Sequence, residues 1–510
     1  MFEYRVFMAD AILKKNTFIF KRKDFHRISI YALSILTIVF LSLFKLIYIP
    51  EARFLTISLL IFYFILIKLL DKSFNLSKLT QYLIIFIPLI YYTEYLFLPN
   101  FIDYLFILTF ILFTLLFVLK KNLFKDYSNF IKQEKILLLT FAFLFSIILW
   151  SFLSFIWAID KMRVFARLQF LFYALLIFIF FTFLLYCVNH KYLFFILVIS
   201  TLILILVGIC EIIYNVHFQI SHVVRKNLVN VPGGLSSNIN NYSVLLFCGL
   251  SYIMIFLSTL KVKINYFVQI SVGVLFSAIL YYFFIKTKSR ANLLAMIIYW
   301  VCILLISFIF IVRNFYVKIK KNYAKILFIL LISLLLIICI LVNYNFSKDY
   351  MGKTIDSFKK NLEISKKKAV SSDQVRINLI RNGLIMLKNS HFLGVGAGNF
   401  IIYAKEYTKM HYKTRGITDS HNLWLEMLVD YGVIIFSFFV FLYINLLVKS
   451  LKLFFSSNKS FTQRAKYLYS FSALSGFTIS SLSPSNIVAS PIMWIFLSFI
   501  ALVLTKAYGE

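Results

Sequence analysis

Apolar runs of about twenty residues recur from end to end of this 510-residue chain, separated by short clusters of Lys, Asp, Asn and Ser. As a helix, a run of that length crosses the roughly 30 Å hydrocarbon core of a bilayer. The run that starts at Ile136, ILLLTFAFLFSIILW, is apolar on all sides, whereas a barrel strand would alternate apolar and polar residues. Because hydrocarbon satisfies no backbone N–H or C=O group, the chain is predicted to cross a membrane as helices.

The composition excludes a water-soluble fold. Hydrophobic residues make up 62% of the chain and charged residues only 14%, against about 45–50% and 25% in ordinary soluble domains. The formal net charge of +33 would suit a nucleic-acid binder. However, the basic residues lie in short connections between apolar runs, where they set topology and contact anionic lipid head groups.

The predicted fold is all-α, a polytopic bundle of about 14 membrane helices (12 to 14) with one large loop. The predicted spans are residues 28–49, 53–70, 79–97, 101–119, 136–157, 168–187, 193–214, 241–259, 264–285, 291–312, 326–343, 422–447, 466–483 and 490–506.

These spans divide the chain into four regions: a basic segment at 1–27, eleven spans in 28–343, a large loop at 344–421, and three spans in 422–510. Alternate short connections carry roughly 28 Lys and Arg on the side of the N-terminus and about 9 on the other. The positive side faces the cytoplasm, so both termini are predicted to be cytoplasmic and the large loop lies on the outer face.

The large loop, 344–421, is long enough to indicate a functional segment. It holds 14 Lys and Arg against six acidic residues, a surplus that would attract anionic lipids and substrates. Ile377, Ile380, Leu384 and Leu387 repeat at helical spacing. We therefore expect one or two short amphipathic helices on the membrane surface.

Three stretches on the predicted outer face place cations or an imidazole beside the membrane. The first is KTKSRAN, residues 286–292, a tight turn in which Arg290 would begin a membrane helix. A guanidinium there can hold a phosphate through two parallel hydrogen bonds. The alternative is an ordinary basic residue that extends toward the head groups from a helix end.

The second stretch, residues 375–400, begins with Arg376 at the head of a helix and ends with Gly394, Gly396 and Gly398. The string GVGAG resembles a nucleotide-binding turn, but no βαβ unit is predicted around it. The alternative is a glycine-rich helix stop that lets the loop pack closely against the spans.

The third stretch is DSHNLWLEMLVDYG, residues 419–432, where the loop returns to the membrane. His421 can take or give a proton near neutral pH. The alternative is that this histidine only caps or buttresses the helix that follows.

Together the three stretches resemble the O-antigen ligase and polymerase superfamily over residues 225–445. Its members show a Thr-x-Ser-Arg-small turn, then an Arg leading a helix that ends in Leu-Gly-x-Gly-x-Gly-x-Phe, then a His-Asn pair that opens a span. The matching residues are Thr287, Ser289, Arg290, Ala291, Arg376, Gly394, Gly396, Gly398, Phe400, His421, Asn422, Glu426 and Gly432. The segment GGLSSNINNYS from Gly233 is similar to another motif of the family. The chain departs from the pattern at Ala291, where Gly is usual, and at His391 and Phe392, where Pro is usual.

The resemblance implies an O-antigen ligase: a glycosyltransferase that needs no metal or cofactor and inverts configuration at the anomeric carbon. It would transfer a glycan from undecaprenyl diphosphate to lipid A core on the periplasmic face of the bacterial inner membrane. Arg290, Arg376 and Arg225 would bind the diphosphate, and His421 would be the general base. The supporting residues would be Ser289, Asn422, Gly394, Gly396 and Gly398.

Alternatives stay open. An O-antigen polymerase, which joins carrier-linked repeats, or a protein O-oligosaccharyltransferase would use the same kind of donor with another acceptor. A lipid-linked glycan flippase is a candidate from a different class. Transporters place charges near the membrane midplane, whereas Lys45 and Lys68 lie close to the ends of their spans. This distribution favours surface chemistry over transport.

Overall fold

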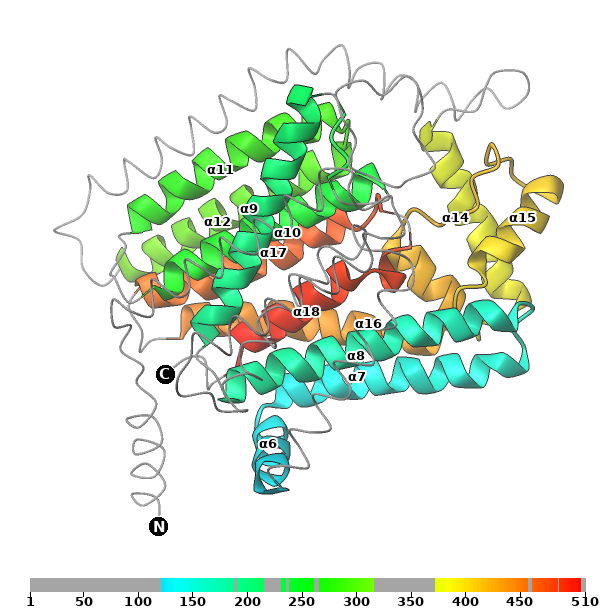
Figure 1. Ribbon diagram of the computed structural model, residues 1–510, viewed down its shortest axis with the longest axis horizontal. Helices are drawn as coiled ribbons and strands as arrows, with labels where there is room; N and C mark the ends of the chain where they lie inside the picture. The colour runs from blue at the N-terminus through cyan, green and yellow to red at the C-terminus, as the bar shows by residue number, and fades with distance from the viewer. Residues whose placement is uncertain are drawn as a thin grey trace, which may run out of the picture. The chain divides into compact units, whose positions relative to one another are not determined.

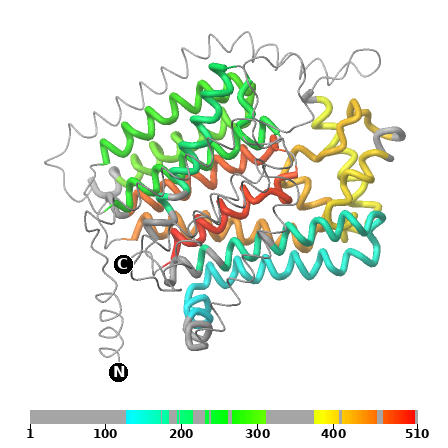
Figure 2. Tube along the Cα trace, viewed as in Figure 1, coloured from blue at the N-terminus to red at the C-terminus, as the bar shows by residue number. Residues whose placement is uncertain are grey.

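The computed structural model describes one helical unit, traced in Figure 1 as ribbons and in Figure 2 as a tube. The described residues are 121–187, 190–214, 231–234, 238–260, 266–315, 372–456, 461–484 and 486–505. Every regular element in them is a helix, as the apolar runs predicted. The predicted spans at 28–49, 53–70, 79–97, 101–119 and 326–343 lie outside the described residues, as does the basic segment 1–27.

The α-helices are α6 (Lys121–Gln133), α7 (Lys135–Leu153), α8 (Lys161–Cys187), α9 (His190–Tyr214), α10 (Ile239–Thr259), α11 (Tyr266–Lys286), α12 (Arg290–Phe315), α14 (Ser372–Asn389), α15 (Phe400–Met410), α16 (Leu423–Phe455), α17 (Phe461–Ser480) and α18 (Pro491–Val503). Two short 3-10 turns, η2 (Ser154–Ile156) and η3 (Ile487–Ala489), lie in the connections after α7 and before α18.

Seven of the described helices are long and apolar enough to cross a membrane: α7, α8, α9, α10, α11, α12 and α16. α10 is the most buried of these, and it packs against α9, α11 and α17. Large apolar side chains of the outer helices are exposed, among them Phe145 on α7 and Leu275 on α11. This is the surface that lipid would cover. The predicted all-α membrane class is therefore confirmed for the described residues, and the total of about 14 spans stays a prediction.

α18 is shorter than the predicted span 490–506. Its 13 residues extend about 20 Å at 1.5 Å per residue, less than the hydrocarbon thickness. Ser490 caps its N-terminus and Pro491 occupies the first turn, and all 13 residues are buried against α7, α8 and α17. α18 is thus a core helix that does not cross the bilayer by its own length.

The predicted boundaries need two further corrections. The basic stretch 120–135, expected as a loop, contains the separate helix α6, which leaves α7 at a steep angle in Figure 1. α8 begins at Lys161, seven residues before the predicted span. The added turns contain Arg167. The predicted bounds placed this residue in a connection, whereas it lies inside α8.

α14 and α15 are the short helices expected in the loop 344–421, and Figure 1 shows them together beside one end of α7 and α8. On α14, Ile380 and Leu384 of the expected apolar stripe are exposed, while Val375 and Leu379 are buried. α14 approaches α16 closely at Gly383, where an added Cβ would lie 3.0 Å from Leu425 Cδ1. That the exposed stripe lies on the membrane surface stays a prediction. Which side of the membrane these helices occupy stays a prediction.

Candidate active site

The connections that were predicted to lie on the outer face meet at one end of the described helices. Asn486, between α17 and α18, donates from Nδ2 to Asp419 Oδ1 at 3.1 Å. The Leu423 backbone N–H, at the start of α16, donates to the Ser481 carbonyl at 3.0 Å. The segment that carries His421 is therefore held against the α17–α18 connection on both of its sides.

The turn before α12 is fixed to the same connection. Lys288 has a positive φ of 55°, so the chain reverses sharply and Arg290 becomes the first residue of α12. Asn292 donates from Nδ2 to Ser289 Oγ at 2.8 Å and accepts a bond from the Ser480 hydroxyl. The Arg290 side chain is exposed beside this anchored turn.

His421 lies between the large loop and α16 with a positive φ of 47°. The next residue, Asn422, caps α16: its Oδ1 accepts from the N–H groups of Trp424 at 3.0 Å and Leu425 at 3.3 Å. The imidazole itself is half-buried and hydrogen-bonded to the backbone of Ser483. The sequence left open whether His421 caps the helix that follows. In the structure the cap is the next residue, Asn422.

The surroundings of His421 favour the neutral imidazole. Burial lowers its pKa most, the nearby Asp419 carboxylate opposes this, and the positive charge of Arg376 lowers the pKa further. The net effect is a pKa below the usual 6.5. An imidazole that is neutral at pH 7 is in the form that a general base requires.

The structure describes three of the four cations and bases singled out in the sequence. Arg376 lies within electrostatic reach of His421. The first turn of α12, which begins with Arg290, and the segment that carries His421 each contact the last turn of α17 or the residues after it. Arg225 lies outside the described residues. Within the described ranges, no group of three or more His, Cys, Asp or Glu side chains is placed to hold a metal ion.

The glycine segment, residues 390–399, docks on a kink in α16. Gly432 interrupts that helix with φ 77° and ψ 177°, which frees carbonyl groups that a continuous helix would use. The Val395 N–H donates to the Val429 carbonyl at 2.8 Å, and the Val433 N–H donates to the Phe392 carbonyl at 3.0 Å. The kink and the segment therefore satisfy each other's backbone groups.

The glycines are required by this close approach. A Cβ on Gly394 would lie 2.5 Å from the Gly432 nitrogen, and one on Gly396 would lie 2.6 Å from Ala158 Cβ. The amide groups of the segment donate to α16, to its Asp430 carboxylate and to Ser154, and no strand accompanies the segment in the described residues. This geometry agrees with the close-packing interpretation of GVGAG and leaves no room for a nucleotide-binding turn.

The departure from proline at His391 and Phe392 has a backbone cause. Both residues have positive φ, 51° and 64°. The proline ring fixes φ near −65°, so proline cannot adopt the path that this turn takes.

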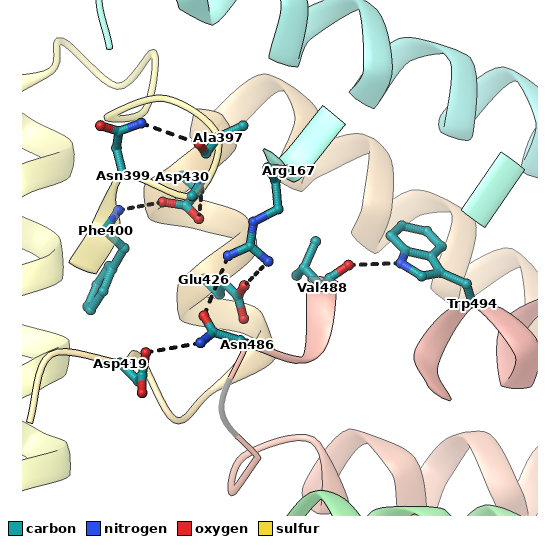
Figure 3. A network of polar contacts seen from close by, with 11 residues as sticks. Arg167, Ala397, Asn399, Phe400, Asp419, Glu426, Asp430, Asn486, Val488 and Trp494 are labelled. Atoms are coloured by element: carbon teal, nitrogen blue, oxygen red, sulfur yellow. Dashed lines mark hydrogen bonds and ion pairs between the residues drawn. The ribbon is translucent and has the colours of Figure 1, made fainter. Parts of the chain in front are cut away.

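Figure 3 shows a buried network that the sequence had not singled out as a unit. The Arg167 guanidinium forms an ion pair with Glu426 Oε1 at 3.1 Å and donates to Asn486 Oδ1 at 3.5 Å. Asn486 in turn holds Asp419. The side chains of Arg167 and Glu426 are only 8% and 2% exposed, so each charge depends on the other for compensation.

Asp430 is the second anchor in this network. Its Oδ1 accepts from the Phe400 N–H at 2.8 Å and its Oδ2 from the Gly398 N–H at 3.0 Å, which caps the start of α15. A charged residue inside an apolar run marks a functional or structural site by default. That signal was present at Glu426 and Asp430, inside the predicted span 422–447, and would have singled out these two carboxylates but not their partner Arg167.

The segment that begins at Gly233 also forms a defined turn. The backbone N–H groups of Gly233 and Gly234 both donate to Glu211 Oε2, at 2.8 and 2.7 Å. Asn238 then caps α10 by accepting from the Asn240 N–H. Glu211 on α9 thus holds the backbone at Gly233 and Gly234.

Comparison with known proteins identifies the same part of the chain as the motifs do. Residues 274–440 match the family model described as O-antigen ligase. The chain is also 27% identical over 131 residues to the teichuronic acid biosynthesis protein TuaE of Bacillus subtilis (strain 168), a match that covers 25% of this chain and 26% of that protein. Arg290, Arg376 and His421 all lie within the matched residues. The predicted resemblance to the O-antigen ligase and polymerase superfamily is therefore confirmed over residues 274–440.

Proposed function

We propose that this protein is a membrane glycosyltransferase that moves a glycan from a polyprenyl diphosphate carrier to an acceptor hydroxyl at the membrane surface. One observation carries the proposal. Within the residues that match the O-antigen ligase family, a half-buried imidazole lies within electrostatic reach of an arginine, and a second arginine begins a helix whose first turn is hydrogen-bonded to the last residue of α17.

The reaction that fits this arrangement is a single displacement. The acceptor oxygen attacks the anomeric carbon as the bond from that carbon to the diphosphate oxygen breaks. His421 takes the acceptor proton, and the carrier diphosphate leaves with the bonding electrons. Attack on the face opposite the leaving group inverts the configuration, and a general base contributes about 10²–10⁴-fold to such a step.

Arg290 and Arg376 are the proposed diphosphate ligands. Guanidinium groups bind phosphate oxygens bidentately and stabilise the charge that develops on the leaving group. Arg290 is the first residue of α12, and Arg376 lies in the second turn of α14. Both side chains therefore act together with the positive end of a helix dipole. Arg225 would be the third ligand.

The proposed donor is undecaprenyl diphosphate-linked glycan, and the proposed acceptor is lipid A core, as in an O-antigen ligase. The second candidate is a polymerase, in which the acceptor is another carrier-linked glycan. The matched relative favours this candidate, because its name assigns it to the biosynthesis of teichuronic acid and does not mention lipid A.

Gene deletion separates the two acceptors. Loss of a ligase leaves lipid A core without glycan while carrier-linked polymer accumulates. Loss of a polymerase leaves only single repeats. Gel electrophoresis of surface glycolipids distinguishes these results.

The proposed location is the bacterial inner membrane, with the loop 344–421 in the periplasm and both termini in the cytoplasm. Lys413 is exposed in this loop, so Lys413→Cys provides a label site. A membrane-impermeant maleimide should label the variant in intact spheroplasts. Labelling only after membrane rupture would reverse the orientation.

Transfer by purified protein tests the chemistry. The wild-type chain in vesicles should convert a lipid-linked donor and an acceptor into product with an inverted anomeric centre, measured by mass spectrometry and NMR. His421→Gln should lose about 10²–10⁴-fold in turnover. His411→Gln, which changes an exposed imidazole in the same loop, is the matched control and should keep wild-type turnover. Equal turnover in both variants would remove His421 from the reaction.

A further inference from the structure

We propose that Arg167 is a positioning residue for this active site: its buried pair with Glu426 and its bond to Asn486 hold the α17–α18 connection against residues 419–422 and so fix the imidazole of His421. The inference rests on the proposed function for the meaning of that imidazole. Nothing in the proposed reaction itself uses the Arg167 network.

Arg167 joins three segments of the chain. It projects from α8, pairs with Glu426 on α16 at 3.1 Å, and reaches Asn486 at 3.5 Å (Figure 3). A fourth segment packs on it, since a Cβ on Gly398 would lie 3.2 Å from the Arg167 Nε atom. One guanidinium thus lies where α8, α16, the glycine segment and the α17–α18 connection meet.

The α17–α18 connection contacts the histidine segment, residues 419–422, at two points. Asn486 donates to Asp419 at 3.1 Å, and the Ser483 backbone is hydrogen-bonded to His421. Asn486 has a positive φ of 50°, a conformation that asparagine tolerates better than most residues. The described residues of the connection therefore contact the histidine segment, residues 419–422, at two points, Ser483 and Asn486.

The burial of Arg167 and its ion pair with Glu426 exclude it as another diphosphate ligand. Its guanidinium is buried and compensated by Glu426, so an incoming phosphate would have to displace that carboxylate. Removal of one partner of a buried ion pair is costly because the other charge remains buried. Arg167 thus acts through Asn486 and Glu426 and does not touch substrate.

Position 167 requires arginine because its side chain has two partners. Its planar fork has several donors and serves Glu426 and Asn486 from different nitrogens, Nη1 and Nη2. Lysine has one ammonium group. Arg167→Lys should keep the charge beside Glu426 and lose the bond to Asn486, whereas Asn486→Ala removes the link to Asp419 and leaves the ion pair.

Two measurements test the proposal on the full-length protein in vesicles. The first is steady-state transfer, in which Arg167→Lys and Asn486→Ala should each lower kcat roughly tenfold or more with KM within about twofold, because misplacing a catalytic group costs rate. The second is the pH dependence of carbethoxylation of His421 by diethyl pyrocarbonate, followed by peptide mass spectrometry, which needs no turnover.

The charges that face His421 are the Asp419 carboxylate and the Arg376 guanidinium. Asp419 raises the pKa of the imidazole. Asn486→Ala removes the bond that holds Asp419, whereas Arg167→Lys keeps that bond but removes the guanidinium that holds Asn486. Carbethoxylation, which requires neutral imidazole, should therefore extend to lower pH in both variants. The matched control is Arg163→Lys, one turn earlier on α8, whose ion pair with Asp160 is more than one-third exposed. It should keep wild-type kcat and the wild-type labelling profile.

The outcomes separate the two proposals. If both variants keep wild-type kcat and the wild-type labelling profile, Arg167 does not position His421. If the labelling profile shifts in both variants but not in Arg163→Lys, the positioning role holds, even if the wild-type protein transfers no glycan. The absence of wild-type transfer would overturn the proposed function alone.

Discussion

Two polar centres lie near the same end of the described helices, and they handle charge differently. In the anchored centre, Arg167, Glu426 and Asp430 are buried, and protein groups compensate their charges. In the reaction centre, Arg290 is exposed and His421 is half-buried. Charge that is compensated within the protein stabilises one arrangement of the chain, whereas accessible cations can meet an anionic substrate.

The difference separates two kinds of residue that look alike in sequence. Arg167 and Arg290 both lie near the start of a membrane helix. The structure shows that the first is buried and holds segments together, whereas the second is exposed. Removal of a charge from the anchored centre should therefore lower stability as well as rate, whereas changes in the reaction centre should lower mainly the rate.

The largest effect is expected at Gly432, under the glycine segment. Gly432→Ala forces a positive φ on a residue with a Cβ, and that Cβ would lie 2.4 Å from the Leu393 carbonyl carbon. Strain and overlap together should lower the free energy of unfolding by about 4 kcal/mol. Denaturant titration in mixed micelles measures this loss.

Gly416 offers the control, because it also has a positive φ but nothing lies within 4 Å of its added Cβ. Gly416→Ala should show only the conformational cost of about 1–2 kcal/mol. Equal losses in the two variants would mean that the dock on α16 contributes no stability.

The next effect is expected at Arg290 and should appear in rate. Arg290→Ala removes an exposed guanidinium at the start of α12, so turnover should fall about 10²-fold while the free energy of unfolding stays unchanged. Lys286→Gln removes another cation from the same turn and should leave turnover within about twofold. A parallel fall in both variants would point to a general electrostatic effect of the turn.

A smaller effect is expected in the pH profile of kcat/KM. The base must be neutral, so activity is present above the pKa of His421 and is lost as the pH falls through it. Arg376 lowers this pKa and Asp419 raises it. Arg376→Gln should therefore move the acid limb to higher pH, and Asp419→Asn should move it to lower pH.

Arg381 is the control for this profile, because it lies on α14 like Arg376 but is exposed and packs over the Tyr412 ring. Arg381→Gln should leave the acid limb in place. An acid limb that no variant moves would assign the titration to another group.

The smallest effect is expected at Asn422, which lies next to His421 and caps the helix that carries Glu426. Asn422→Ala removes the cap of α16 and should lower the free energy of unfolding by about 1 kcal/mol, whereas Asn422→Asp keeps the acceptor and most of the stability. Thermal unfolding followed by circular dichroism distinguishes the two variants. A loss of several kcal/mol in Asn422→Ala would assign the residue a larger role than capping.

Much of the fold could be predicted because hydrocarbon imposes strong rules. Each apolar run in the described residues forms a helix close to its predicted bounds, and the residues around Arg290, Arg376 and His421 were found from their motifs. α18 was predicted too long because apolar composition does not distinguish a buried core helix from a membrane span. The stripe of α14 that packs inside the protein, with Val375 and Leu379, could not be predicted because it depends on the approach to α16 at Gly383.

The anchored centre could not be assembled from the sequence. Arg167, Glu426 and Asn486 are separated by 259 and 60 residues, and no spacing rule joins them. Their pairing follows from burial, since a guanidinium inside a helix bundle must find a carboxylate. The sequence identified residues that face a substrate, whereas the fold was needed to show what holds them in place.

The central claim is that Arg290 and Arg376 bind the carrier diphosphate while His421 accepts the proton of the acceptor. Equilibrium binding of undecaprenyl diphosphate to the protein in nanodiscs tests this claim most directly. Arg290→Ala and Arg376→Ala should each weaken binding by roughly tenfold or more, as expected for loss of a charge-assisted contact. His421→Gln should bind with an affinity within about twofold of the wild type, because it loses only the base. Unchanged binding in both arginine variants, or an equal loss in all three variants, would contradict this division of roles.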